Sequence, residues 1–223
     1  MCVLFEKTLI KKKVKGKTKI MKAKKYFLSM VTVYMAYLTH GMQALIFSQN
    51  QVNFAIKWGF DMSDPNSAAY AAGAAAVSTA IAWTGLGKFL SVWIGGEISD
   101  RVGRKKLMIG GAALYIVCFA TMLTTTNATI AAFAGLMAGV ATSGFWDASG
   151  YPAVQEAYPV APGTALIMIK FFVALSSIFY PIIAVKTAAA GNWKFNIVLP
   201  LVLSCVVLVL AVLAPFVYDD EKG

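Results

Sequence analysis

Apolar residues recur in long stretches from residue 26 onward, and short polar segments separate them. Six stretches come close to or exceed the roughly 20 apolar residues that a helix needs to cross a bilayer. They cover Tyr26–Phe47, Ala68–Ile94, Leu107–Thr124, Ile130–Val154, Thr164–Val185 and Ile197–Val217. The stretches lack the two-residue alternation of a membrane β-barrel, and they are rich in the small residues that allow close helix packing in lipid. The pattern predicts an all-α membrane protein with six transmembrane helices in one bundle.

The composition supports a lipid environment for most of the chain. Of 223 residues, 59% are hydrophobic and 13% are charged, whereas roughly a quarter of an ordinary soluble protein is charged. The mean hydropathy of +0.69 agrees with this interpretation. The three cysteines and the single histidine show no spacing typical of a metal site. We therefore expect a lipid bilayer as partner, no metal centre, no cofactor and no enzymatic activity.

The net charge of +10 is concentrated at the start of the chain. Residues 1–25 hold ten lysines and one glutamate, a local charge of +9, which leaves +1 for the remaining 198 residues. This distribution argues against a nucleic-acid-binding fold, in which basic residues gather on the folded surface. Residues 1–25 are predicted to form a polybasic cytoplasmic tail, which either lies on anionic lipid or stays a disordered arm.

The basic residues between the stretches predict the orientation, because cytoplasmic connections carry most of the lysine and arginine. With the N-terminus in the cytoplasm, fifteen basic residues lie on the cytoplasmic side and three on the opposite side. Without the tail, the count is still five against three. Both termini are therefore predicted to be cytoplasmic. Residues 26–218 form the bundle, and residues 219–223 are the start of a cytoplasmic linker or the C-terminus.

The second connector carries the most specific motif, which we call the signature loop (residues 96–108). It reads Gly-Glu-Ile-Ser-Asp-Arg-Val-Gly-Arg-Lys-Lys-Leu-Met. A tight turn between two spanning helices needs glycine where backbones approach or φ becomes positive, and we assign Gly96 and Gly103 to this role. Asp100 is placed at the end of the second helix, where it can pair with Arg101 or Arg104 or cap the next helix.

These residues resemble the signature of the major facilitator superfamily, G-x-L-A-D-R-x-G-R-K-x-x-L, between the second and third helices. The matching positions are Gly96, Asp100, Arg101, Gly103, Arg104 and Lys105. The resemblance implies that the loop latches the two halves of a transporter in the outward-open state. The end of the fourth stretch also resembles bacterial members, which implies that Glu156 is the acidic partner of the loop arginines.

The resemblance extends over residues 26–218, the six-helix N-terminal half of a fold that normally has twelve helices. The fourth stretch lacks the arginine motif of many members, and the fifth lacks the glycine-proline signature of antiporters, since Pro181 is isolated. A proton-coupled drug exporter is therefore less favoured. The resemblance implies secondary active transport of a small organic solute in the bacterial plasma membrane, by a half-transporter that needs a homodimer or a partner half. The alternatives are a truncated fragment that transports nothing and a membrane scaffold subunit.

Three charged residues fall inside the predicted spans, where charge is costly and often functional. At 1.5 Å per residue, Lys88, Asp147 and Lys170 lie about 12, 13 and 9 Å from the cytoplasmic helix ends. One interpretation is a charged cluster on the solute pathway, which would favour an anionic or zwitterionic solute. The other is that the lysines extend to the headgroups, or that Lys88 and Asp147 form a structural pair.

Three further residues are candidates for the solute or proton pathway. His40 is the only histidine, and Gln43 follows it on the first predicted helix. A single histidine in a helix is more often a packed hydrogen-bonding residue than a proton relay. Trp146 precedes Asp147 and either stacks on a solute ring or packs within the bundle.

Overall fold

A computed structural model describes residues 24–222, and the helices account for nearly all of them. Their bounds are α2 (Phe27–Gln49), α3 (Gln51–Lys57), α4 (Ala68–Val102), α5 (Arg104–Thr124), α6 (Ala128–Val140), η1 (Ala141–Asp147), α7 (Ala148–Ala157), α8 (Pro162–Ala189), α9 (Phe195–Leu213) and α10 (Val217–Lys222). The segment η1 is a wider π-helical turn that joins α6 to α7. The predicted polybasic tail lies outside the described residues, apart from its last two lysines.

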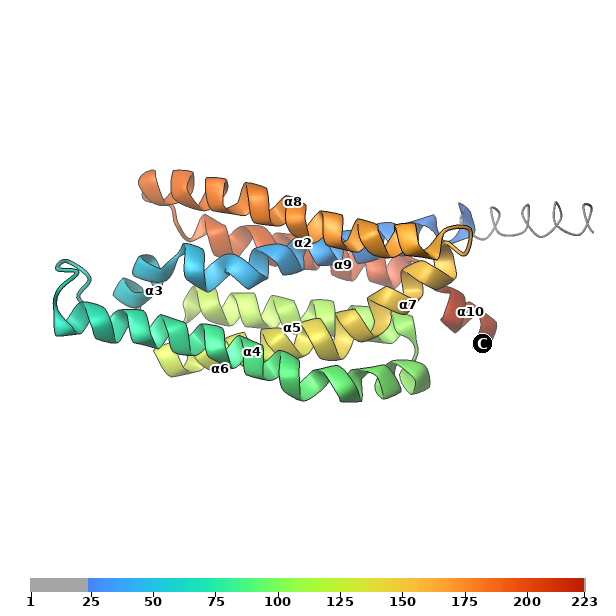
Figure 1. Cartoon of the computed structure of the whole chain (residues 1–223), viewed down its shortest axis with the longest axis horizontal. Helices are drawn as coiled ribbons and strands as arrows, with labels where there is room; N and C mark the ends of the chain where they lie inside the picture. Colours follow the sequence, from blue (N-terminus) through green and yellow to red (C-terminus); the bar gives the residue numbers. More distant parts are fainter. Residues whose placement is uncertain (1–23, 223) are drawn as a thin grey trace, which may run out of the picture.

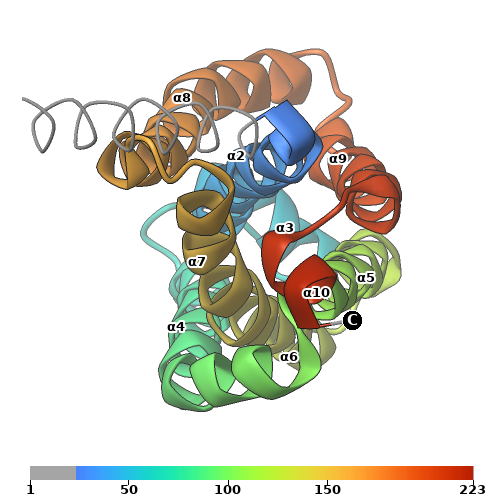
Figure 2. The same ribbon diagram turned by 90° about the vertical axis from the view of Figure 1, so that its right-hand side faces the viewer.

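The long helices run side by side along the long axis of the molecule (Figure 1). One group holds α8, α2 and α9, and the other holds α4, α6 and α5. Figure 2 shows the bundle from the end at which α7 meets α10. The tightest packing joins α4 to α6, α2 to α8 and α5 to α9. Because α2 also packs against α9, it lies in the interior of its group.

Glycines set the closest helix contact, between α4 and the α6–η1 segment. A Cβ atom at Gly87 would lie 2.0 Å from the carbonyl oxygen of Leu136, and one at Gly139 would lie 2.1 Å from that of Thr84. Farther along, a Cβ atom at Gly95 would lie 2.6 Å from the carbonyl oxygen of Gly144. Only glycine allows the two backbones to approach this closely, as helix packing in lipid requires.

Five helical segments in the described part of the chain are long and apolar enough to cross a membrane. They are Ala68–Val102, Arg104–Thr124, Ala128–Ala157, Pro162–Ala189 and Phe195–Lys222. The predicted first span corresponds to α2, which has 23 residues and is not among these five segments. Polar side chains are among its buried residues, including Thr32, Thr39 and Gln43. The sixth span and the cytoplasmic position of the termini remain predictions.

The signature loop differs most from the sequence-based expectation. The connector predicted between the spans that end at Ile94 and begin at Leu107 is reduced to Gly103, because α4 continues to Val102 and α5 begins at Arg104. Gly103 has φ of 104° and ψ of 153°, a conformation almost restricted to glycine. The expectation for Gly96 was wrong: it lies inside α4 in regular helix, and a Cβ atom there would contact nothing within 4 Å.

Candidate functional site

The carboxylate of Asp147 is positioned by the π-helical turn η1. This turn interrupts the path from α6 to α7, and such turns are often found at functional sites. The Tyr37 hydroxyl of α2 donates a hydrogen bond to Asp147 Oδ1 at 2.7 Å, and Ser143 Oγ donates to Oδ2 at 3.1 Å. Each carboxylate oxygen of this half-buried side chain therefore has a neutral donor.

Two tyrosine side chains lie between Lys170 and Asp147 and connect them by successive contacts. Its ammonium donates to the Tyr151 hydroxyl at 2.6 Å and lies 5.2 Å from the centre of the same ring. The Tyr151 ring packs edge-on against Tyr37, with 5.5 Å between ring centres, and Tyr37 holds Asp147. The exposed Lys170 on α8 is thus connected to Asp147 by two tyrosines.

Lys88 on α4 is half-buried. Helix α4 packs against η1, the turn that carries Asp147. Among the residues that the structure describes, no ion pair within 4.0 Å joins Lys88 or Lys170 to Asp147. The structure therefore brings the three charges into one region without forming the direct pair of the structural alternative.

His40 takes part in a polar network inside the bundle. Its Nδ1 lies 3.2 Å from the Tyr115 hydroxyl and 3.4 Å from Thr142 Oγ1. The two hydroxyls lie 2.5 Å apart, and Tyr115 also donates to Gln43 Oε1 at 3.4 Å. This network ties α2 to α5 and η1, and it holds His40 by hydrogen bonds inside the bundle.

The indole of Trp146 is fully buried and packs within the bundle. It stacks on Tyr115 with 4.4 Å between ring centres, and its Nε1 donates to the carbonyl oxygen of Met108 at 3.3 Å. It also fills the space beside Gly111, where a Cβ atom would lie 2.5 Å from the ring. These contacts favour the packing interpretation, because no face of the ring is open to a solute.

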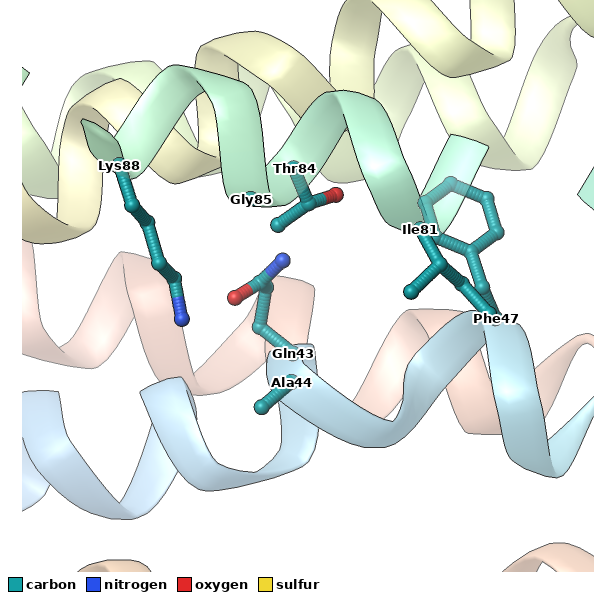
Figure 3. Close-up of a pocket in the computed structure, with 7 residues that line it drawn as sticks. All are labelled: Gln43, Ala44, Phe47, Ile81, Thr84, Gly85 and Lys88. Carbon is teal, nitrogen blue, oxygen red and sulfur yellow. The ribbon is translucent and has the colours of Figure 1, made fainter. Parts of the chain in front are cut away.

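A pocket of about 210 Å³ lies between α2 and α4. Figure 3 shows the side chains of Gln43, Thr84 and Lys88 in the space between the two helices. The remaining lining is apolar or glycine and comprises Ala44, Phe47, Ile81 and Gly85. The buried Nε2 atom of Gln43 has no hydrogen-bond partner.

The signature loop is organised around Arg104, which is only 7% exposed. Its Nη1 donates to Ser99 Oγ at 2.6 Å and to Asp100 Oδ1 at 2.7 Å. Its Nη2 contacts Glu156 Oε1 of α7 at 3.5 Å. Arg101 instead pairs with Glu97 on the exposed side of α4. Of the two loop arginines, Arg104 is therefore the one that joins the loop to the end of the fourth predicted helix.

Helix α10 folds back on the signature loop (Figure 2). The Tyr218 hydroxyl donates to the carbonyl oxygen of Asp100, and the Tyr218 ring lies 4.5 Å from the Arg104 guanidinium. Asp219 Oδ2 accepts the backbone N–H of Lys105 at 3.0 Å. At the start of the described chain, the Lys25 ammonium donates to Asp220 Oδ2 at 2.8 Å, and this hydrogen bond raises the pKa of Lys25.

Sequence reasoning missed the partners of the candidate residues. Ser143 and Tyr151 lie four positions before and after Asp147, so a search of helix neighbours would have found them. Tyr37 and Tyr115 are distant in sequence, and no local pattern marks them as partners of Asp147 and His40. The contacts of Tyr218 and Asp219 with the loop likewise depend on the direction in which the chain folds back.

Comparison with known proteins gives a consistent family. The family model of the Major Facilitator Superfamily matches residues 26–223. Over 168 residues, the chain is 35% identical to Inner membrane transport protein YdiM of Escherichia coli (strain K12), covering 75% of this chain and 38% of that protein. Over 128 residues it is 34% identical to Multidrug transporter MdfA of Escherichia coli O157:H7, covering 54% of this chain and 31% of that protein.

Solved structures show the same fold. The proton:xylose symporter XylE superposes with a TM-score of 0.75 at 12% identity, covering 91% of this chain and 48% of that one. A second structure, the partially occluded inward-open conformation of XylE from E. coli, has a TM-score of 0.72 at 13% identity and covers 89% of this chain and 52% of that one. The chain spans about two fifths of the length of YdiM, and about half of each solved structure.

Proposed function

Because the chain belongs to the Major Facilitator Superfamily of membrane transporters, we propose that it is one half of a secondary active transporter for a small organic solute. The solute pathway follows the side of α2, α4, η1 and α8 that carries Lys88, Asp147 and Lys170. We name these three residues the charged triad. The complete transporter pairs this bundle with a second one, supplied either by another copy or by a partner half.

The observation that carries this proposal is that the described structure has no direct ion pair within the charged triad. Charged side chains inside a membrane bundle are expensive and rarely persist without a partner or a function. Here Asp147 is held by neutral hydroxyls, while Lys88 has no ion pair among the described side chains. A purely structural role would favour direct pairing, so the separated charges support a role in solute or ion handling.

The net charge of the charged triad favours an anionic or zwitterionic solute. Two ammonium groups and one carboxylate leave a net charge of +1 when all three are ionised. A solute carboxylate or phosphate would compensate for this excess, and a cation would add to it. Asp147 is the candidate for any proton coupling, because its hydroxyl partners Tyr37 and Ser143 can donate to the ionised form and can also accept from the protonated one.

The proposed topology has six spans with both ends in the cytoplasm. Helix α2 is the first of them in the chain and adds to the five apolar segments. The start of α2, the signature loop and α10 lie at the same end of the bundle (Figure 1). Lys25, Arg101, Arg104, Lys105 and Lys106 gather there, and the positive-inside rule assigns such an end to the cytoplasm. Labelling single cysteines at residue 24 and at residue 64 with a membrane-impermeant reagent tests this: only residue 64 should react in intact cells.

Transport is tested with the chain reconstituted in proteoliposomes, alone and together with the remaining part of the 35% identical relative. Oligomer mass is measured in mild detergent, and uptake is compared for small organic anions, zwitterions and cations. We expect uptake of anions or zwitterions, a loss of at least tenfold in Lys170→Gln, and little change in Lys186→Gln. The control lysine lies exposed in the last turn of the same helix.

Two results would overturn the proposal. If wild type and Lys170→Gln take up a cation equally well, the charged triad has a structural role and does not select the solute. No uptake in either arrangement, with correctly folded protein, would favour the non-transporting fragment or the scaffold subunit. Stoichiometric assembly with a second copy would support the homodimer, whereas uptake only with the added partner half would support the heteromeric arrangement.

A further inference from the structure

The pocket between α2 and α4 combines an apolar wall with two polar groups. One is an amide nitrogen without a hydrogen-bond partner, and the other is an ammonium without an ion pair among the described residues. Phe47 and Ile81 form the apolar side, and Gln43 and Lys88 reach into the same space from opposite helices (Figure 3). The residues of this chain that line the pocket all come from α2 and α4.

The amide of Gln43 is incompletely satisfied. The residue is 1% exposed, its Oε1 accepts from Tyr115, and its Nε2 has no partner. Native proteins pair nearly all buried polar groups, so an unpaired buried donor calls for an explanation. An acceptor that enters from the pocket supplies one.

The second polar group is the ammonium of Lys88. Among the described residues, no ion pair within 4.0 Å joins it to a carboxylate. Asp147 lies on η1, which packs against α4, but its oxygens accept hydrogen bonds from Tyr37 and Ser143. A half-buried ammonium without a direct counter-ion attracts an anion that can enter the pocket.

We propose that this pocket binds the carboxylate of a small monocarboxylic acid. Lys88 pairs with the carboxylate, Gln43 Nε2 donates to one of its oxygens, and the body of the acid packs against Phe47 and Ile81. The inference deepens the proposed function, because it specifies the solute class at one point of the proposed pathway. It also assigns recognition to Gln43 and Lys88, whereas Asp147 and Lys170 lie outside the pocket lining.

The volume limits the size of the acid. An apolar cavity of about 150 Å³ accommodates benzene, and pockets for drug-sized ligands measure about 300–1,000 Å³. At about 210 Å³, this pocket fits one ring or a short aliphatic body together with a carboxylate. Larger amphiphilic molecules would extend beyond it.

Benzoate and benzamide are suitable probes, because they share the ring and differ in charge. Equilibrium dialysis of the detergent-purified chain at pH 7, corrected for empty micelles, gives their affinities. We expect benzoate to bind at least tenfold more tightly than benzamide. Lys88→Gln should remove this difference, and Gln43→Leu should weaken benzoate at least threefold. Lys106→Gln, which alters an exposed lysine on α5, should leave both affinities unchanged.

Equal affinity of wild type for the two probes would overturn the proposal, and so would benzoate binding that persists unchanged in Lys88→Gln. The comparison of probes on wild-type protein needs no variant, so misfolding of a variant cannot obscure it. The assay measures binding and not transport. Absence of uptake with intact benzoate binding would contradict the proposed function alone, whereas uptake of acids without binding in this pocket would contradict only the present inference.

Discussion

The carboxylate of Asp219 accepts a hydrogen bond from the backbone N–H of Lys105, 114 positions earlier in the chain. Helix α5 begins directly after Gly103, which has no side chain to cap its first turn. Asp219 supplies the missing acceptor from α10 and places a negative charge where the helix dipole favours it. A Cβ atom at Gly103 would lie 2.2 Å from Asp219 Oδ1. The glycine therefore serves both the turn and the approach of the cap.

We expect Asp219→Ala to lower the free energy of unfolding by about 0.5–2 kcal/mol, the usual cost of losing a helix cap. Unfolding by SDS in mixed micelles, followed by circular dichroism, measures the change. Asp64→Ala is the control, because that aspartate lies in the exposed connector at the other end of the bundle. An equal effect of the two substitutions would show that Asp219 does not cap α5.

The two arginines of the signature loop should differ strongly in their contribution to stability. Arg104 is buried and contacts Asp100 and Glu156, so Arg104→Ala leaves a half-buried carboxylate without its partner and should cost about 3 kcal/mol. Arg101 forms an exposed pair with Glu97, and Arg101→Ala should cost less than about 1 kcal/mol. The same SDS titration compares them. A cost for Arg101→Ala equal to that of Arg104→Ala would contradict the assignment.

The hydroxyl of Tyr37 should matter because it holds the carboxylate of Asp147. Tyr37→Phe removes a hydrogen bond of 2.7 Å to a charged group, for which a loss of about 1.5–3 kcal/mol is expected. The matched control is Tyr34→Phe, one helical turn earlier, where the hydroxyl makes a 3.3 Å bond to the carbonyl oxygen of Ala165. Thermal unfolding in detergent distinguishes them, and a greater loss in the control would refute the prediction.

Lys57 caps the C-terminal end of α5, whereas Asp219 caps the N-terminal end of the same helix. Its ammonium donates to the carbonyl oxygens of Met122 and Leu123 at 2.8 and 2.6 Å, which leaves a positive charge at the C-terminus of the helix. Lys57→Met should lower the free energy of unfolding by about 1 kcal/mol, since both carbonyls lose their donor. Lys186→Met, at an exposed lysine, should have little effect in the same titration. Faster amide hydrogen exchange in residues 119–124 should accompany the loss.

The helical segments were largely predictable because lipid as a solvent imposes a simple condition. Every backbone polar group must be satisfied within the segment, so long apolar stretches become helices. The prediction failed where local chemistry competed with this rule. The polar residues Glu97 and Asp100 suggested a loop, yet they continue α4. Glu97 pairs with Arg101 one turn later, and Asp100 pairs with Arg104 at the start of α5.

The candidate pathway residues were predicted from the cost of charge in a membrane, and the structure placed them in one region. Their individual surroundings could not be predicted. Trp146 and His40 were both open to a pathway role, and contacts with Tyr115 on α5 assign packing to the first and a hydrogen-bonded position to the second. Tyr115 is separated from His40 by 75 positions. No periodicity or local spacing specifies such a contact.

The sequence by itself determined the class of protein, the approximate helices and the residues that merit functional tests, because hydropathy, glycine content and the signature loop are local properties. Only the tertiary structure decided which partners those residues meet. The π-helical turn aims Asp147 at Tyr37, the fold-back of α10 brings Asp219 to Lys105, and the separation of α2 from α4 leaves Gln43 and Lys88 facing one pocket. These relationships depend on how whole helices pack, and helix packing combines small contributions from residues that are far apart in the chain.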